Sequence, residues 1–228
     1  MVAPGGRARA VAVKFSNTEG RRAAPRSYAA RVHEEVVLPF PERVPSVRHV
    51  RSTLLLASLQ SLRDAGHFDR YAKALPPDHH DVLLGAVAGV WIDIAHATAH
   101  YEACTSLGLS PDRQIELGRG TFARTKVTIL GTSVRLAQDA GVTPWTVLPH
   151  FQRFWSRGLD GGAIRIARLG PKDAQFEVKN CSLLDIDYFR NGLRGLATGM
   201  IELFCRKAYL RQRPARAPTT VSFSAQWA

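Results

Sequence analysis

The chain has 228 residues, 45% of them hydrophobic, so it can bury a sizeable core, and this excludes general disorder. Its formal net charge is +12, but residues 1–27 and 206–216 each contribute +5, which leaves +2 for the rest. A nucleic-acid-binding domain usually carries its basic surface on the folded body. The charge therefore favours solubilising ends, with non-specific nucleic-acid contact through these tails as an open alternative.

The first predicted segment is a flexible basic arm over residues 1–26, which is rich in Gly, Ala, Arg and Pro and has no periodicity. Residues 27–228 are expected to form a single α+β domain. Its first element is a strand at 31–38, because this Val-rich stretch precedes three prolines.

Helices are expected through most of the next 130 residues and again near the end of the chain. Apolar residues recur at helical spacing, and Gly or Pro marks the ends of the segments. The expected helices cover, in order, about 46–65, 67–75, 79–84, 85–107, 111–140, 145–158 and 187–209.

The period changes to two after residue 162. Apolar and polar residues alternate over 163–169 and 174–180, with turn residues between them. Alternation returns at 219–227. We therefore predict an α+β fold in which helices pack on a small antiparallel sheet made of this hairpin and the C-terminal strand.

The cysteines and the apolar stretches bear on location. Cys104, Cys181 and Cys205 lie far apart and form no CxxC pair, which argues against a disulfide framework and fits a reducing compartment. No stretch approaches the roughly 20 apolar residues of a membrane span, and the N-terminus lacks a signal-peptide core. We expect a cytoplasmic protein.

One face of the helix expected at 85–107 carries Asp93, His96, His100 and Cys104, while Trp91 lies on the opposite, apolar face. Two histidines four residues apart can share a metal, with Asp93 as a third ligand. The surrounding residues are small and uncharged, which favours a helix buried in an interface or lining a pocket. Structural, ligand-binding and metal-binding roles all stay open.

A second unusual face carries Gly192, Gly195 and Gly199 at helical spacing. Glycine destabilises a helix by about 1 kcal/mol relative to Ala, so three on one face imply that something approaches the backbone closely. A packed helix, a ligand and a dimer partner are the alternatives.

A resemblance to a known family rests on five stretches: HYEACTSLGLSPDRQIELG, AGVTPWTVLPHFQRFW, LGPKDAQFEV, DYFRNGLRGLATGMIELFCRKAY and the final QWA. These resemble a paralogous family of bacterial proteins, from myxobacteria, that has no assigned activity. The family is in turn distantly similar to the heme-NO-binding, 4-vinyl-reductase and transport-particle superfamily. That resemblance implies an α+β domain that binds heme, a small hydrophobic molecule or a partner protein, and that dimerises. It carries over no catalytic residue, and a heme-proximal histidine motif is missing.

The leading hypothesis is a non-enzymatic sensory or regulatory module that binds a small hydrophobic ligand or a partner protein, as a monomer or a homodimer. The expected ligand-binding residues are Trp91, Asp93, His96, His100, Gly195 and Gly199. The alternatives are a metal-dependent enzyme that uses His96, His100 and Asp93, and a nucleic-acid-associated protein that acts through its basic termini. The sequence names no metal or other cofactor.

Overall fold

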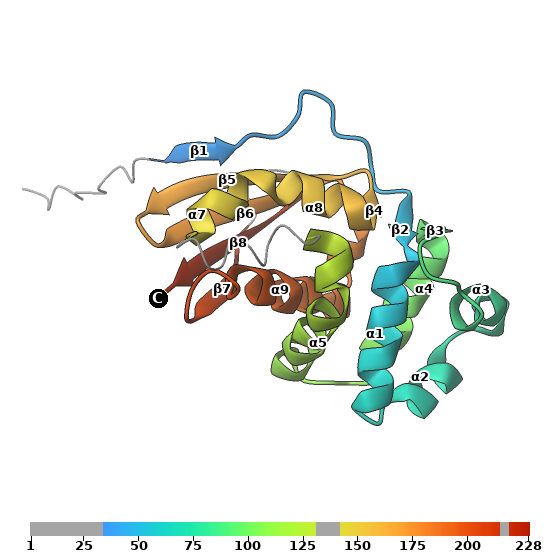
Figure 1. The fold of residues 1–228 in the computed structure, drawn as a ribbon. Coiled ribbons are helices and arrows are strands. Elements are labelled where there is room, and N and C mark those ends of the chain that lie inside the picture. Colours follow the sequence, from blue (N-terminus) through green and yellow to red (C-terminus); the bar gives the residue numbers. More distant parts are fainter. Residues whose placement is uncertain (1–33, 131–141, 215–218) are drawn as a thin grey trace, which may run out of the picture. The chain divides into compact units, whose positions relative to one another are not determined.

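Two sheets and a set of helices make up residues 34–130, 142–214 and 219–228, which the computed structural model describes (Figure 1). They belong to one compact unit, His33–Ala228. The arm expected at 1–26 lies outside the described residues, so this boundary stays a prediction. None of the described helices is both long enough and apolar enough to cross a membrane.

The larger sheet has five antiparallel strands in the order β1-β5-β6-β8-β7. Its centre is the hairpin predicted from the alternation after residue 162, and the last strand of the chain pairs with this hairpin as expected. The α+β fold class is therefore confirmed. The strands are β1 (Glu35–Leu38), β5 (Ala163–Gly170), β6 (Asp173–Lys179), β7 (Ala208–Arg213) and β8 (Thr220–Trp227).

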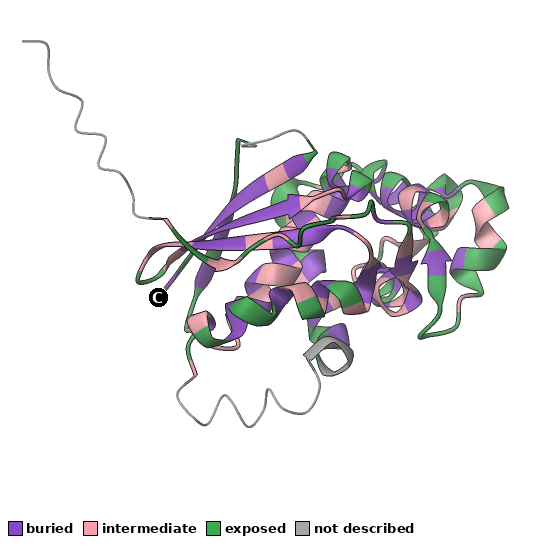
Figure 2. Cartoon of the chain, turned by 90° about the horizontal axis from the view of Figure 1, so that it is seen from above, coloured by how far each residue is buried: buried purple, intermediate pink, exposed green. Residues whose placement is uncertain are grey.

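The central strands of this sheet are covered on both faces. Figure 2 shows several strands coloured largely purple, the colour of buried residues. In β6 the five consecutive residues 174–178 are all buried. One of them is charged: Glu177 accepts a hydrogen bond of 2.7 Å from Arg165 Nη1, and Arg165 also pairs with Glu34. This pairing offsets part of the cost of burying the carboxylate.

Helices lie against the larger sheet and beyond one of its ends, and they make up most of residues 52–130 (Figure 1). Short 3-10 turns separate some of them at Pro77–His79, Leu148–His150 and Ser182–Asp185. The helices are α1 (Ser52–Asp64), α2 (Phe68–Ala74), α3 (His80–Leu84), α4 (Ile94–Thr105), α5 (Pro111–Leu130), α7 (Pro144–Val147), α8 (Phe151–Gly158) and α9 (Asp187–Ile201). The predicted continuation of α5 to residue 140 lies outside the described residues.

A second sheet of three short strands, in the order β3-β2-β4, was not expected from the sequence. Each strand has only two or three residues, too few for an alternating pattern to stand out. The strands are β2 (His49–Arg51), β3 (Trp91–Asp93) and β4 (Leu159–Asp160).

The single helix predicted over 85–107 is therefore wrong in its first part. Gly89 has φ of +89°, outside the helical region, and the β-branched and aromatic residues that follow favour the extended strand β3. Helix α4 begins only at Ile94. Asp93 ends the strand and caps the helix, because its Oδ1 accepts a hydrogen bond of 2.8 Å from the backbone N–H of Ala95.

The helix predicted over 187–209 is also too long. Helix α9 ends at Ile201, and 208–213 form β7, which pairs with β8. The alternation that builds this strand is visible in its burial, since Ala208 and Leu210 are buried while Tyr209 and Arg211 are exposed. The stretch was too short and too basic to stand out beside the preceding helix.

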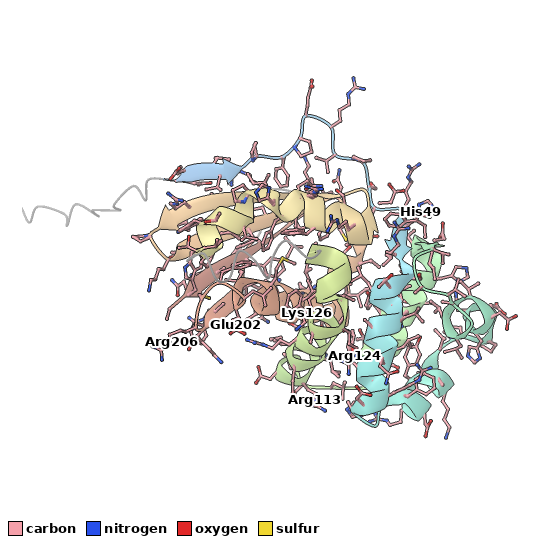
Figure 3. The ribbon with its side chains drawn as sticks, viewed as in Figure 1. His49, Arg113, Arg124, Lys126, Glu202 and Arg206 are labelled. Atoms are coloured by element: carbon pink, nitrogen blue, oxygen red, sulfur yellow. The ribbon has the colours of Figure 1, made fainter. Side chains whose placement is uncertain are left out.

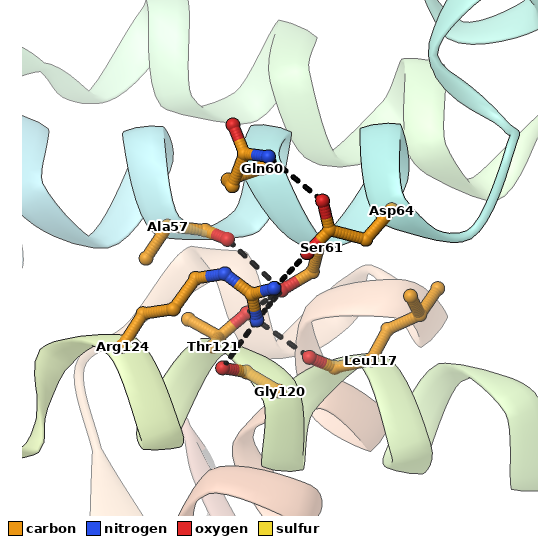
Figure 4. Close-up of polar contacts among 8 residues, drawn as sticks. All are labelled: Ala57, Gln60, Ser61, Asp64, Leu117, Gly120, Thr121 and Arg124. Carbon is orange, nitrogen blue, oxygen red and sulfur yellow. Dashed lines mark hydrogen bonds and ion pairs between the residues drawn. The ribbon is translucent and has the colours of Figure 1, made fainter.

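A group of polar contacts joins α1 to α5 (Figure 4). Arg124 of α5 forms an ion pair with Asp64 of α1, and its Nη1 donates to the Ser61 hydroxyl at 3.3 Å. Figure 3 shows Arg113, Arg124 and Lys126 along the same helix, α5. The ion pair is largely exposed, so it positions the two helices more than it stabilises them.

Candidate functional site

An apolar cavity with a volume of about 120 Å³ lies against the larger sheet and is only partly enclosed. Its walls come from segments far apart in the sequence: α1, α4, α5, α8, α9 and the strands β4, β5, β6, β7 and β8. The apolar side chains of the wall include Leu54, Phe151, Phe154, Trp155, Ile164, Phe176, Val178, Phe189, Leu193, Leu196, Met200, Leu210 and Phe223.

Gly192 of α9 is among the residues that line the cavity. A Cβ atom added there would meet no other heavy atom within 4 Å. Of the three glycines in the predicted ladder, this one borders open space.

Gly195 and Gly199 have a different role. A Cβ at Gly195 would overlap the carbonyl oxygen of Ile115 in α5, and a Cβ at Gly199 would lie 2.7 Å from the ring of Phe122. Both glycines let α5 pack closely on α9, and neither lines the cavity. The close approach predicted from the ladder is therefore made by a neighbouring helix.

His100 is fully buried beside the cavity wall. Its Nδ1 lies 2.9 Å from the Tyr71 hydroxyl and its Nε2 lies 3.1 Å from the Ser58 hydroxyl. Ser58 lines the cavity, and so does Tyr101, whose ring packs edge-on against the imidazole. Burial lowers the pKa of His100 to about 3, so the imidazole is neutral at physiological pH and supports the wall.

The other residues expected on this helix face lie elsewhere. His96 is half-buried, and its Nδ1 lies 2.8 Å from Nδ1 of His79. Asp93 is exposed and caps α4, and Trp91 is 41% exposed under the guanidinium of Arg51. None of the six predicted residues lines the cavity, although His100 contacts its wall.

The structure does not bring His96, His100 and Asp93 together as a set of metal ligands. Within the described residues, no group of three or more His, Cys, Asp or Glu side chains is arranged to hold a metal ion. Both ring nitrogens of His100 already have hydrogen-bond partners in the core. The predicted metal site depends on Asp93, His96 and His100 sharing one helix face. Asp93 instead lies at the end of strand β3, before the helix begins.

Sequence reasoning missed most residues of the cavity. The sequence predicts a helix over 145–158, but the convergence of its Phe151, Phe154 and Trp155 with α9 and the sheet depends on contacts between distant segments. Gly192 was the one signal that could have found the site, as a glycine of the ladder that borders open space.

The fold is similar to solved structures of H-NOX domains. An Fe(II) unliganded H-NOX protein from K. algicida aligns with a TM-score of 0.55 and 11% identity, over 78% of this chain and 96% of that one. An oxygen-binding H-NOX domain related to soluble guanylate cyclases aligns with a TM-score of 0.52 and 14% identity, over 78% and 94%. No family model and no curated protein matches the chain. The distant similarity to the heme-NO-binding superfamily is supported at the level of fold, while membership of the myxobacterial family stays a prediction.

The cavity does not fit the heme that the names of these neighbours suggest. Axial heme ligands are usually His, Cys, Met or Tyr, and the described cavity wall contains neither His nor Cys. Burial raises the pKa of the Tyr101 and Tyr188 phenols, which keeps them protonated and leaves Met200 as the remaining donor. A cavity of about 150 Å³ holds benzene, and this one, at about 120 Å³, is far too small for a porphyrin.

Proposed function

We propose that the chain is a non-enzymatic sensory or regulatory module of the cytoplasm, and that it binds a small hydrophobic molecule in the cavity beside α9. The observation that carries this proposal is the cavity itself, whose wall is aromatic and aliphatic and includes an empty position at Gly192. Ligand sites are typically concave and apolar with few polar groups. The shared fold with H-NOX domains, some of which are described as heme or oxygen binders, supports a sensing role.

The size of the cavity sets the size of the ligand. Removing apolar surface from water contributes a favourable free energy of about 25 cal/mol per Å². A cavity of comparable volume in another protein accepts one benzene ring. We therefore expect a molecule with roughly the bulk of a single aromatic ring or a six-carbon chain. A larger ligand would need α8 or α9 to shift.

The decisive experiment fills the cavity from Gly192. Gly192→Leu places a side chain in the open space, and leucine also favours the helix, so the variant is expected to fold and to lose binding of benzyl alcohol, measured by ligand-observed NMR. Gly192→Ala is the matched control and is expected to retain most of the binding. Equal binding by the unaltered protein and Gly192→Leu would contradict the proposal.

A partner protein, or a second copy of this chain, is the second candidate because apolar side chains are exposed over residues 82–91. Val87 is 65% exposed, and Val82, Leu84, Val90 and Trp91 are also exposed. Exposed apolar patches are typical of protein interfaces. If this surface forms a homodimer, sedimentation velocity will give a dimer for the unaltered chain and a monomer for Val87→Asp. A monomer at every concentration would contradict self-association.

A further inference from the structure

Arg194 of α9 is a charged residue in the apolar wall of the cavity. It takes part in no salt bridge among the described residues, and Asp112 acts on it only through longer-range attraction. Its Nε is buried and has no hydrogen-bond partner. Burial also lowers the pKa of the guanidinium.

The guanidinium is held in place by neutral acceptors. Nη1 donates to Oδ1 of Asn191 at 3.0 Å, and Nη2 donates to the carbonyl oxygen of Leu210 at 3.0 Å. The Asn191 amide in turn donates to Oε1 of Gln114 at 2.9 Å, and Gln114 donates to the Leu109 carbonyl at 2.8 Å. These buried amides fix the position of Arg194 without neutralising its charge.

Other polar side chains in the wall are already satisfied by the protein. The Ser58 hydroxyl bonds His100, the Thr121 hydroxyl donates to the Leu117 carbonyl, and Trp155 Nε1 donates to the Gly161 carbonyl at 2.7 Å. Arg194 differs from them because it keeps a buried donor without an acceptor. A buried donor without an acceptor destabilises the fold unless something binds it.

We propose that Arg194 binds the carboxylate of the ligand, so that the molecule taken by the cavity is a small lipophilic carboxylic acid. This inference rests on the proposed function, which requires only an apolar ligand. A guanidinium presents parallel N–H donors that match the two oxygens of a carboxylate, and Nε is one of these donors. The anion supplies the missing acceptor and the missing negative charge, while the apolar wall takes the rest of the molecule.

The test compares acids with alcohols of the same shape. We titrate the full chain by calorimetry with benzoate and benzyl alcohol, and with hexanoate and hexan-1-ol. In the unaltered protein each acid is expected to bind roughly tenfold to hundredfold more tightly than its alcohol, the range of a hydrogen bond to a charged group. In Arg194→Met the affinity for each acid is expected to fall by a similar factor, and the affinity for each alcohol by about twofold or less.

Two further variants separate local contact from charge. Arg194→Lys keeps the charge but loses the planar donors, so acid binding is expected to fall between that of the unaltered protein and Arg194→Met. Arg190→Met removes an equal charge one turn away that does not line the cavity, and acid binding is expected to change less than about threefold. If Arg194→Met does not fold, two measurements test the proposal instead. They are the ratio of acid affinity to alcohol affinity in the unaltered protein and the acid affinity of Arg194→Lys.

The outcomes distinguish the two proposals. If benzyl alcohol binds as tightly as benzoate, or if Arg194→Met binds benzoate like the unaltered protein, the acid assignment is overturned while the apolar site stands. If none of the four compounds binds, both the acid assignment and the ligand-binding function fail.

Discussion

His100 shows how a single buried residue links the core to the cavity. Its two ring nitrogens hold the hydroxyls of Tyr71 and Ser58, and Ser58 forms part of the cavity wall. Because both partners are neutral and the site is fully buried, a protonated imidazole would be strongly disfavoured there. The residue that suggested metal chemistry in the sequence is a neutral hydrogen-bonding support.

This burial predicts a pH dependence of stability. Between pH 6.5 and about 3 the unfolded chain binds a proton at His100 that the folded chain does not. The free energy of unfolding therefore falls as the pH is lowered through this window, by up to about 1.4 kcal/mol per pH unit from this residue. Urea unfolding at several pH values measures the slope.

The control for this prediction is His100→Gln, which removes the titrating imidazole and retains a side chain that can form hydrogen bonds. In His100→Gln the part of the slope that His100 supplies is expected to disappear, whereas His150→Gln, at an exposed position, is expected to keep it. An unchanged slope in His100→Gln would mean that other groups account for the acid sensitivity.

At the scale of elements, the packing of α9 on α5 depends on where its glycines lie. Gly195→Ala forces a Cβ into the Ile115 carbonyl and is expected to lower the free energy of unfolding by about 1–3 kcal/mol. Gly192→Ala, one turn earlier, meets only open space and is expected to raise it by up to about 1 kcal/mol. Denaturant titration of the two variants measures the contrast, and equal effects would contradict the assigned packing.

How far the sequence predicts this fold depends on the strength of each local signal. The strands β5 and β6 of the hairpin have eight and seven residues, long enough for a pattern of period two to show, and the predicted ranges 163–169 and 174–180 agree with their ends to within a residue. Strands β2, β3 and β4 have two or three residues each and exist because they pair with one another across more than 40 residues of chain. No local pattern encodes such pairing.

The cavity was harder to predict than the elements that build it. Its wall joins α1, α4, α5, α8 and α9 to five strands. Residues as far apart in the sequence as Leu54 and Phe223 meet there, and no local pattern indicates such a contact. The sequence gives Arg194 no distinguishing pattern, because its missing partner becomes apparent only once α9, Gln114 and Leu210 are in contact.

At the scale of the whole molecule, charge and ligand binding are expected to be separable. The described cavity wall lies between residues 54 and 223, whereas residues 1–26 supply +5 of the net charge of +12. Deletion of 1–26 is therefore expected to leave benzyl alcohol binding unchanged and to lower the salt concentration that elutes the protein from heparin. Loss of alcohol binding would show that the arm contributes to the site.

Strand β7 closes one end of the five-stranded sheet, and its other backbone edge is not paired within the described sheet. The unpaired backbone groups of such an edge can pair with a strand of another chain, which is the first step of aggregation. Arg211 and Arg213 are exposed on this edge strand, and their positive charges oppose the docking of a second copy of the same strand. The basic side chains of this edge therefore oppose uncontrolled growth of the sheet.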